Sequence, residues 1–203
     1  TIFGKRPGLP GYKILFSHPQ NFCKDMPLTL HDCPTEKFPI FKTMRRERKT
    51  MLRVVVAVAL CLLVGALSGF ATQSSVDTWY STLIKPSFNP PNWIFAPVWT
   101  VLYILMGVAA GMVWGYGYYH KWVKTALYIF GFQLLLNASW SIVFFGLQLP
   151  LPALVVLLLL LILIVITIRR FYIISRTAAY LMVPYLLWVL FAGILNFKIV
   201  QLN

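Results

Sequence analysis

Long apolar stretches, separated by short polar or basic ones, make up the chain after residue 50. They predict five membrane-spanning helices, at residues 52–71, 95–118, 123–147, 152–168 and 177–200. Several of them approach or reach the roughly 20 apolar residues that a helix needs to cross the core of a bilayer. The last stretch is interrupted by Pro184, which has no backbone N–H to donate. Because the later connections are short, we expect neighbouring helices to pack antiparallel in a compact bundle.

Residues 1–50 have a different character, with six prolines, ten basic and four acidic residues and no lasting hydrophobic periodicity. Such a segment buries too little apolar surface to fold alone, so we expect a disordered basic leader. The expected domains are this leader, 1–50, and a five-helix membrane domain, 51–203. Whether the leader belongs to the mature protein stays open, because Met51 would make a plausible start. A presequence or a basic cytosolic tail is the functional alternative.

The composition also indicates a membrane protein. Hydrophobic residues make up 59% of the chain and charged residues only 11%, against roughly 25% charged residues in soluble domains. The net charge of +13 does not indicate nucleic-acid binding, because ten of the 18 lysines and arginines lie in the first 50 residues and the others mostly flank apolar stretches. Basic residues in such positions set topology and contact anionic lipid headgroups. We therefore expect the lipid bilayer, and no nucleic acid, as a partner.

The basic residues predict an orientation as well. With the N-terminus in the cytoplasm, most of them lie on the cytoplasmic side and only Lys85 and Lys198 lie opposite. We expect a multi-pass protein of a bacterial inner membrane or of an organellar membrane such as the mitochondrial outer membrane. In the bacterial case the N-terminus is cytoplasmic and the loop between the first two helices lies outside.

That loop is unusually rich in aromatic residues and proline. Residues 79–103 read WYSTLIKPSFNPPNWIFAPVWTVLY and contain four prolines and three tryptophans. Proline fixes φ and biases the preceding residue toward extended backbone, so the loop is expected to hold one shape. A stiff aromatic cover beside an apolar bundle points to the enclosure of a flat, hydrophobic ligand.

Polar and aromatic residues of three predicted helices fall on common faces. Turned inward, these faces would wall a small-molecule cavity with rings and two amides. Helix packing explains the same spacing about as well, because Asn and Gln also hydrogen-bond neighbouring helices. The faces are Trp99, Tyr103, Met106, Ala110 and Trp114 on the second helix; Asn137, Trp140 and Phe144 on the third; and Pro184, Trp188, Ala192 and Asn196 on the fifth.

A strip of small residues, Gly107, Gly111 and Gly115, lies beside the aromatic face of the second helix. Such strips let two helices approach closely. The sequence leaves open whether the partner helix belongs to the same chain or to a second copy.

The sequence shows no recognisable catalytic or metal-binding arrangement. Asp77 is the only acid after Met51, and no His stands beside it. Acid–base or nucleophilic catalysis and ion-coupled transport therefore lack the groups that they need. Cys61 is expected to be a small buried thiol. The leader cysteines lack zinc-ligand spacing, so no metal is expected.

Three blocks of the sequence resemble the TspO/MBR family, whose members are also called tryptophan-rich sensory proteins, translocator proteins or peripheral benzodiazepine receptors. The blocks are Trp79-Tyr80 with KPSFNPPNWIFAPVW and Tyr103, QLLLNASWSIVFFG from Gln133 to Gly146, and PYLLWVLFAGILN from Pro184 to Asn196. The resemblance covers essentially everything after Met51. It implies an all-α integral membrane protein, a five-transmembrane-helix bundle with the Trp/Pro-rich loop between helices 1 and 2, often a homodimer, with a pocket beneath that loop.

The resemblance also implies a ligand class. Family members bind porphyrins such as protoporphyrin IX and haem, and benzodiazepine-type drugs, and animal members also bind cholesterol. We therefore expect a porphyrin or haem as a ligand, with no required cofactor. A sterol ranks below it, because Phe197 stands where the proposed cholesterol motif centres on Tyr; Phe88 likewise replaces a Trp of the loop motif. By motif, the ligand-binding residues would be Trp93, Trp99, Tyr103, Asn137, Trp140, Trp188, Phe191, Ala192, Leu195 and Asn196.

Three functions follow from the resemblance. The first is a membrane receptor or sensor that binds tetrapyrroles and affects porphyrin or stress handling. The second is a light-dependent enzyme that breaks down porphyrin, with Trp99 and Trp140 as electron or radical partners. The third is a transporter for porphyrin or sterol. We expect a binding protein rather than an enzyme.

Overall fold

A computed structural model describes residues 39–203, except the side chains of residues 39–47, 71, 72, 74, 76 and 77. The chain divides into two units, Thr1–Lys42 and Thr43–Asn203, and the membrane domain lies in the second. Helix α1 begins at Pro39, so no element starts at the expected boundary at Met51. Residues 39–50 of the expected leader belong to α1, and the rest of the leader, 1–38, lies outside the described residues. The division at Met51 stays a prediction.

The described part of the chain consists of helices and their connections, without a strand. Five helical segments are long and apolar enough to cross a membrane: Arg48–Phe70, Asn92–Gly115, Lys121–Gly146, Pro150–Ile174 and Arg176–Leu202. The prediction of an all-α, five-span membrane protein is therefore confirmed. The elements are α1 (Pro39–Asp77), α2 (Trp79–Thr82), α3 (Asn92–Gly115), α4 (Lys121–Ser141), the π-helical turn η1 (Ile142–Gly146), α5 (Pro150–Ile174), α6 (Arg176–Leu181) and α7 (Val183–Leu202).

The fifth span is made of two helices, as the position of Pro184 predicts. Met182 separates α6 from α7. Pro184 stands in the first turn of α7, where a missing N–H costs no helical hydrogen bond. The short α6 is capped by Ser175, whose Oγ accepts a hydrogen bond from the Ala178 N–H at 3.4 Å.

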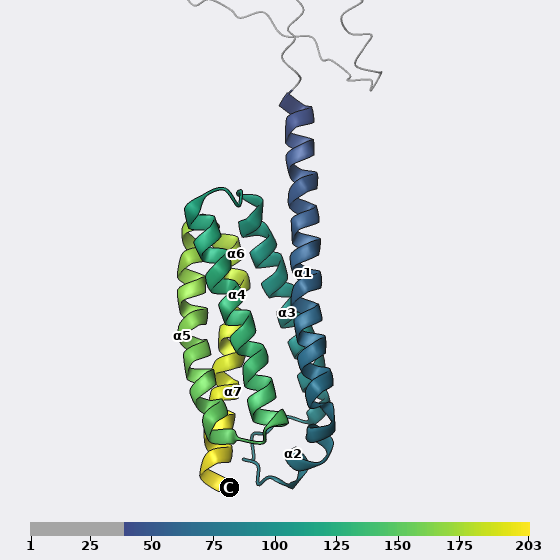
Figure 1. The fold of residues 1–203 in the computed structure, drawn as a ribbon, viewed down its shortest axis with the longest axis vertical. Coiled ribbons are helices and arrows are strands. Elements are labelled where there is room, and N and C mark those ends of the chain that lie inside the picture. Colours follow the sequence, from purple (N-terminus) through teal and green to yellow (C-terminus); the bar gives the residue numbers. More distant parts are fainter. Residues whose placement is uncertain (1–38) are drawn as a thin grey trace, which may run out of the picture. The chain divides into compact units, whose positions relative to one another are not determined.

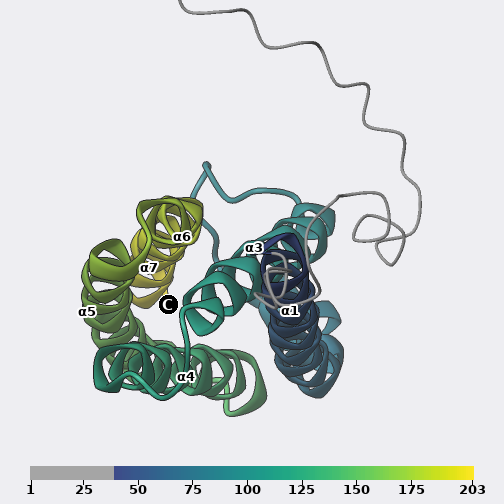
Figure 2. The same cartoon turned by 90° about the horizontal axis from the view of Figure 1, so that it is seen from above.

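Within residues 43–203 each membrane-spanning segment runs antiparallel to the one before it in the sequence (Figure 1). Helix α5 packs against α4, α6 and α7, while α3 packs against α4, α6 and α7. Seen from above, α1 lies on the side of α3 that faces away from α5 (Figure 2). The connection from α1 to α3, which contains α2, lies at the same end of the bundle as the C-terminus. This arrangement leaves the inner faces of α1, α3, α4 and α7 at that end available for a site.

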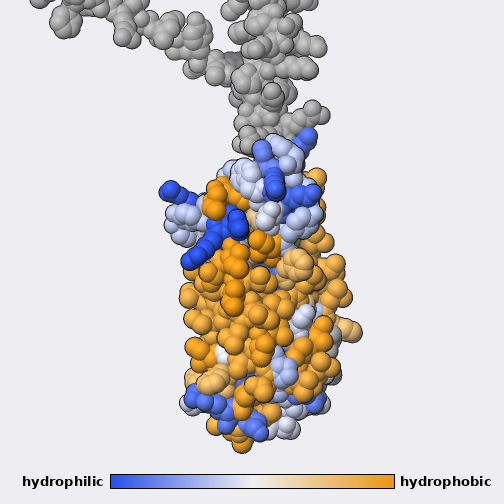
Figure 3. All heavy atoms as spheres, turned by 60° about the vertical axis from the view of Figure 1, so that its left-hand side comes forward, coloured by the Kyte–Doolittle hydropathy of each residue, from blue (hydrophilic) through white to orange (hydrophobic). Residues whose placement is uncertain are grey.

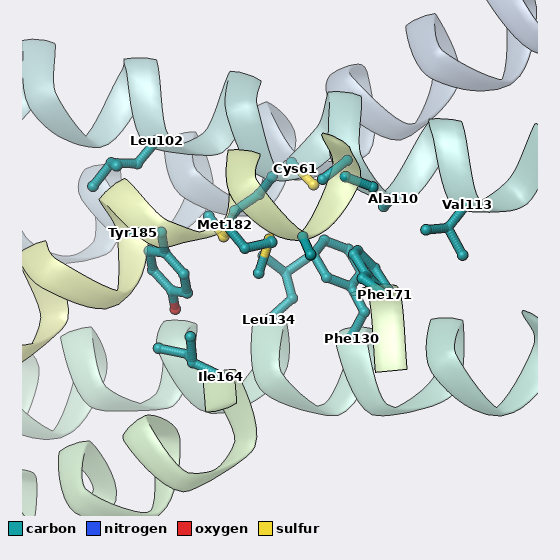
Figure 4. Close-up of a cluster of buried hydrophobic side chains, with 14 of the residues drawn as sticks. Cys61, Leu102, Ala110, Val113, Phe130, Leu134, Ile164, Phe171, Met182 and Tyr185 are labelled. Atoms are coloured by element: carbon teal, nitrogen blue, oxygen red, sulfur yellow. The ribbon is translucent and has the colours of Figure 1, made fainter. Parts of the chain in front are cut away.

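The apolar core draws on all five spans (Figure 4). Cys61 of α1 is buried in this core, as expected. The rings of Phe130 and Phe171 stack with centroids 5.9 Å apart and join α4 to α5. The core therefore fixes the helices on which the polar and aromatic faces stand.

The strip of small residues on α3 packs against α1 of the same chain. A Cβ added to Gly107 would overlap the backbone of Val58, and one added to Gly111 would overlap the backbone of Val54. Only glycine lets the two helices approach this closely. The sequence left open whether this strip packs on a helix of the same chain or of a second copy. In the structure it packs on α1 of the same chain.

Hydrophilic residues gather at the two ends of the bundle, and an apolar band separates them (Figure 3). Lys85 and Lys198 lie at the end that carries the Trp/Pro-rich loop. The opposite end holds the larger group, which agrees with the sides assigned from the sequence. Which end faces the cytoplasm stays a prediction. The larger group is Arg48, Lys49, Arg53, Lys121, Lys124, Arg169, Arg170 and Arg176.

Candidate functional site

A cavity of about 810 Å³ lies between α1, α3, α4, η1 and α7, beside the Trp/Pro-rich loop. This volume falls within the range of roughly 300–1,000 Å³ that small-molecule sites occupy. Helix packing alone does not account for such a space between the aromatic faces. Every residue expected to bind ligand lines the cavity, and their role in binding stays a prediction: Trp93, Trp99, Tyr103, Asn137, Trp140, Trp188, Phe191, Ala192, Leu195 and Asn196.

Trp99 of α3 stands at the centre of the aromatic wall. Its ring centroid lies 5.8 Å from that of Tyr103, 6.1 Å from that of Trp140 and 6.4 Å from that of Tyr185. These distances fall within the ~4.5–7 Å range of favourable aromatic pairs. The Tyr103 ring in turn lies against α1 at Gly65, where a Cβ would overlap it. Three helices thus hold one continuous group of rings.

A second group of rings covers the α7 side of the cavity. The Trp188 centroid lies 6.1 Å from Phe95 of α3 and 5.5 Å from Phe191. Phe191 also lies 6.3 Å from Phe88, which ties the Trp/Pro-rich loop to α7. Trp93 differs from these residues, because 73% of its surface is exposed. It therefore borders the opening of the cavity rather than its interior.

The sequence did not identify every residue of the wall. Phe144 and Phe145 both line the cavity, with ring centroids 4.8 Å apart, although they are successive residues. In an α-helix successive residues point about 100° apart, so helical spacing placed only Phe144 on the inner face. The π-helical turn η1 brings Phe145 to the same side. Tyr80 and Phe95 were also missed, and their only signal was the aromatic density of the loop.

The amide of Asn137 joins two tyrosines in the wall of the cavity. The Tyr103 hydroxyl donates to Asn137 Oδ1 at 2.6 Å, and Asn137 Nδ2 donates to the Tyr185 hydroxyl at 3.1 Å. All three side chains are buried. Since both amide atoms already have protein partners, Asn137 first holds α3, α4 and α7 together. Its second N–H is what it can still offer to a ligand.

Asn196, the other expected amide, links α7 to the start of α5. The orientation that satisfies both amide atoms lets its nitrogen donate to the Pro150 carbonyl at 3.0 Å and its oxygen accept from the Leu154 N–H at 3.2 Å. Asn196 is only 2% exposed. Its amide therefore serves a contact between helices, although the residue also lines the cavity.

Two indole N–H groups in the wall lack a hydrogen-bond partner among the described residues. They are Nε1 of Trp140 and Nε1 of Trp188, and both are buried. A buried donor without a partner is rare and costs about 1–3 kcal/mol. Because both residues line the cavity, an acceptor atom of a bound ligand is the natural partner for these donors.

Hydrogen bonds fix the shape of the Trp/Pro-rich loop. The Tyr80 hydroxyl donates to Asn89 Oδ1 at 2.9 Å, and the Asn89 N–H donates to the Pro86 carbonyl at 3.0 Å. Lys85 Nζ lies 4.6 Å from the centroid of the Tyr80 ring. Burial raises the pKa of Tyr80, and the hydrogen bond to Asn89 lowers it. Burial has the larger effect, so the pKa lies at about 12. The hydroxyl therefore stays protonated, and remains a donor, at neutral pH.

Asn203, which follows α7, is hydrogen-bonded to the same loop at Ile84. Asn203 Nδ2 donates to the Ile84 carbonyl at 3.1 Å, and Asn203 Oδ1 accepts from the Ile84 N–H at 3.0 Å. We call this pair of bonds the Asn203 clasp. It connects the loop to the end of α7 and so to the wall that carries Trp188 and Phe191.

Comparison with known proteins places the site in context. The model of the TspO/MBR family matches residues 57–202, a range that contains every residue lining the cavity. The Tryptophan-rich protein TspO of Chlorobaculum tepidum is 46% identical over 155 residues, which are 76% of this chain and 98% of that protein. The Translocator protein of Bos taurus is 39% identical over 154 residues, 73% of this chain and 90% of that protein. The Tryptophan-rich sensory protein of Cereibacter sphaeroides is 38% identical over 130 residues, 63% and 78% of the two chains.

Proposed function

Because this chain belongs to the TspO/MBR family, we propose that it binds a tetrapyrrole such as protoporphyrin IX or haem in the aromatic cavity. Membership of this family supports a role as a membrane receptor or sensor. The proposal adds the ligand class, and with it a part in porphyrin or stress handling.

One observation carries the proposal: rings from three helices border one space. The Trp99 ring centroid lies 5.8 Å from that of Tyr103 on the same helix, α3, and 6.1 Å from that of Trp140 on α4. Together with Trp188 of α7, these rings line a cavity of about 810 Å³. A flat macrocycle offers large π faces to such rings, and stacked or tilted aromatic pairs gain about 0.5–1.5 kcal/mol beyond area burial. The wall is therefore better matched to a planar aromatic ligand than to a flexible aliphatic one.

The polar groups of the cavity fit the edge of such a ligand. The buried N–H groups of Trp140 and Trp188 are donors without partners among the described residues. None of the described residues that line the cavity is charged. The propionates of a porphyrin would therefore be held by indole N–H groups or would lie at the opening near Trp93, where water reaches them.

The test is a titration of the purified protein with protoporphyrin IX in the dark, followed by tryptophan quenching. We expect saturable quenching that the double variant Trp99→Phe, Trp140→Phe weakens by about tenfold in affinity, because two wall rings lose area and one donor is removed. Trp122→Phe, an exposed residue outside the cavity, is the matched control and should leave the affinity unchanged. Equal affinities in the two variants would reject the aromatic cavity as the site.

Light-dependent breakdown of the porphyrin is a second candidate. The contact between Trp99 and Trp140, with centroids 6.1 Å apart and rings inclined by 33°, favours it because an electron could pass between the two indoles. The same sample, illuminated in air, separates the two functions. A new absorbing product that accumulates beyond one equivalent of protein would show turnover, whereas bleaching without such a product supports binding alone.

A further inference from the structure

Ring contacts close the part of the cavity that lies between Tyr80 and Phe191 beneath the Trp/Pro-rich loop, whereas the exposed Trp93, one helical turn before Ala96 on α3, stands at an opening. Tyr80 is 3% exposed, and its ring centroid lies 5.6 Å from that of Phe145 and 6.2 Å from that of Phe144. Phe88 contacts Phe191 on the opposite wall. The Asn203 clasp adds two hydrogen bonds. Passage of a ligand between Tyr80 and Phe191 would require all of these contacts to break together.

The side of the cavity between α1 and α3 is bordered by small residues instead. Ala66 and Gly69 of α1 and Ala96 and Thr100 of α3 line the cavity, and all four are exposed. A residue that lines a cavity and is also exposed stands at an opening of that cavity. A Cβ added to Gly69 would meet no atom of the described residues within 4 Å. We call the opening bordered by these four residues the lateral portal.

The close packing of α1 on α3 changes along the two helices and produces this opening. At Gly111 and Gly107 a Cβ would overlap the α1 backbone itself. Further along, at Gly65, the space beside α1 is filled by the Tyr103 ring rather than by backbone, and at Gly69 no atom of the described residues lies within 4 Å of an added Cβ. The two helices therefore touch at one end and leave a gap at the end that carries the cavity.

The lateral portal lies within the membrane-spanning segments. Ala66 and Gly69 belong to the span Arg48–Phe70, and Ala96 and Thr100 to the span Asn92–Gly115. At about 1.5 Å per residue, Thr100 lies roughly 12 Å inside the second of these spans. The Thr100 hydroxyl donates to the Ala96 carbonyl at 2.8 Å, so it offers no free donor at the opening. Exposed apolar residues surround the portal on both helices: Leu63, Leu67 and Phe70 on α1, and Val101 and Ile104 on α3.

From this geometry we infer that the cavity exchanges its ligand sideways with the hydrocarbon core of the bilayer, through the lateral portal. The partner of this surface is the acyl chain of a phospholipid, which lies at the portal and is displaced by a membrane-dissolved ligand. The identity of that ligand as a porphyrin rests on the proposed function, but the contact with acyl chains does not.

The first test measures binding rates in phosphatidylcholine nanodiscs loaded with protoporphyrin IX. Ala66→Phe and Ala96→Phe place a ring at the portal. We expect both variants to lower the association and the dissociation rate constants together, by about fivefold or more, because a narrower passage raises the barrier in both directions. Ala59→Phe, on an exposed position of α1 outside the cavity, is the matched control and should leave both rates unchanged.

Other outcomes overturn the inference. If the added rings raise the dissociation rate and weaken affinity without slowing association, they fill the cavity and do not block a passage. If Asn203→Ala speeds both rates while the portal variants bind as fast as the Ala59→Phe control, the ligand passes beneath the loop.

A second test needs no porphyrin and separates this inference from the proposed function. In nanodiscs of dibromostearoyl phosphatidylcholine, bromine on an acyl chain quenches nearby tryptophan fluorescence. If the unmodified protein binds no porphyrin, the proposed function fails. The quenching by brominated acyl chains then decides by itself whether lipid lies at the lateral portal. Weaker quenching in Ala66→Phe than in Ala59→Phe supports acyl chains at the portal, since Trp99 and Trp140 line the cavity behind it. Equal quenching in the two variants overturns the inference.

Discussion

The Tyr103 hydroxyl donates to Asn137 Oδ1 at 2.6 Å, and this bond ties α3 to α4 inside the membrane domain. Asn137 Nδ2 extends the link to Tyr185 of α7 at 3.1 Å. The same three residues stand beside Trp99, whose ring contacts both tyrosines. The amide therefore does more than line the cavity, because it sets the positions of the rings that form the wall.

Replacement of Asn137 is expected to destabilise the protein. Asn137→Leu keeps a similar volume but removes the acceptor of the Tyr103 hydroxyl and one of the partners of the Tyr185 hydroxyl. A buried group left unpaired costs about 1–3 kcal/mol, so the melting temperature in detergent should fall by several degrees. Ser139→Ala is the control on the same helix, since Ser139 is exposed and donates only to the Leu135 carbonyl. Equal melting temperatures for the two variants would show that the amide bonds add nothing to stability.

Trp140→Phe should change stability and ligand binding in opposite directions. The substitution removes a buried N–H without a partner among the described residues, while the ring contact with Trp99 is largely kept. The ligand-free protein should melt at the same temperature or higher, since an unsatisfied donor costs about 1–3 kcal/mol. Affinity for protoporphyrin IX should fall, because the ligand loses one donor. A variant that is less stable but binds equally well would contradict a role for this N–H in binding.

Much of the fold followed from the sequence, because the bilayer imposes a simple rule. Span lengths and the break before Pro184 follow from hydrophobicity and from the missing N–H of proline. Helical spacing brought Trp99, Trp140 and Trp188 to one cavity, but Met106, Ala110, Trp114 and Pro184 of the expected faces are not among the residues that line it. Spacing is informative here because residues three or four positions apart in an α-helix lie on the same side of it.

Other features depend on contacts that spacing does not encode. Phe145 reaches the cavity only because η1 is a π-helical turn. The Asn203 clasp joins residues 119 positions apart. The amide of Asn196 is used by α5 rather than left for a ligand. In each case the contact depends on which group of another segment lies next to the side chain after the helices have packed, and the spacing of residues in the sequence does not give this.

The Trp/Pro-rich loop should loosen at alkaline pH through Tyr80. Burial raises the pKa of Tyr80 from 10.0 to about 12, so the native state holds this proton more tightly than the unfolded chain. This difference in pKa stabilises the folded protein fully at pH values below the pKa of Tyr80 in the unfolded chain. The stabilisation is lost as the pH rises through the pKa of Tyr80 in the folded protein. The melting temperature should therefore drop more between pH ~9 and pH ~12 in the unmodified protein than in Tyr80→Phe. Tyr119→Phe, at an 84% exposed position, should drop as the unmodified protein does, and an equal drop in Tyr80→Phe would contradict the assignment.

Two alanine substitutions of glycine should have opposite effects on stability. At Gly111 a Cβ would overlap the backbone of Val54, so Gly111→Ala must push α1 away from α3. Overpacking of this kind costs about 1–3 kcal/mol. At Gly131 of α4 a Cβ would meet no atom within 4 Å, and alanine is favoured over glycine by about 1 kcal/mol in a helix. Thermal unfolding in detergent should therefore place Gly111→Ala below the unmodified protein and Gly131→Ala at or above it. If both variants melt together, α1 does not pack on α3 through the glycine strip, and the geometry that opens the lateral portal is lost with it.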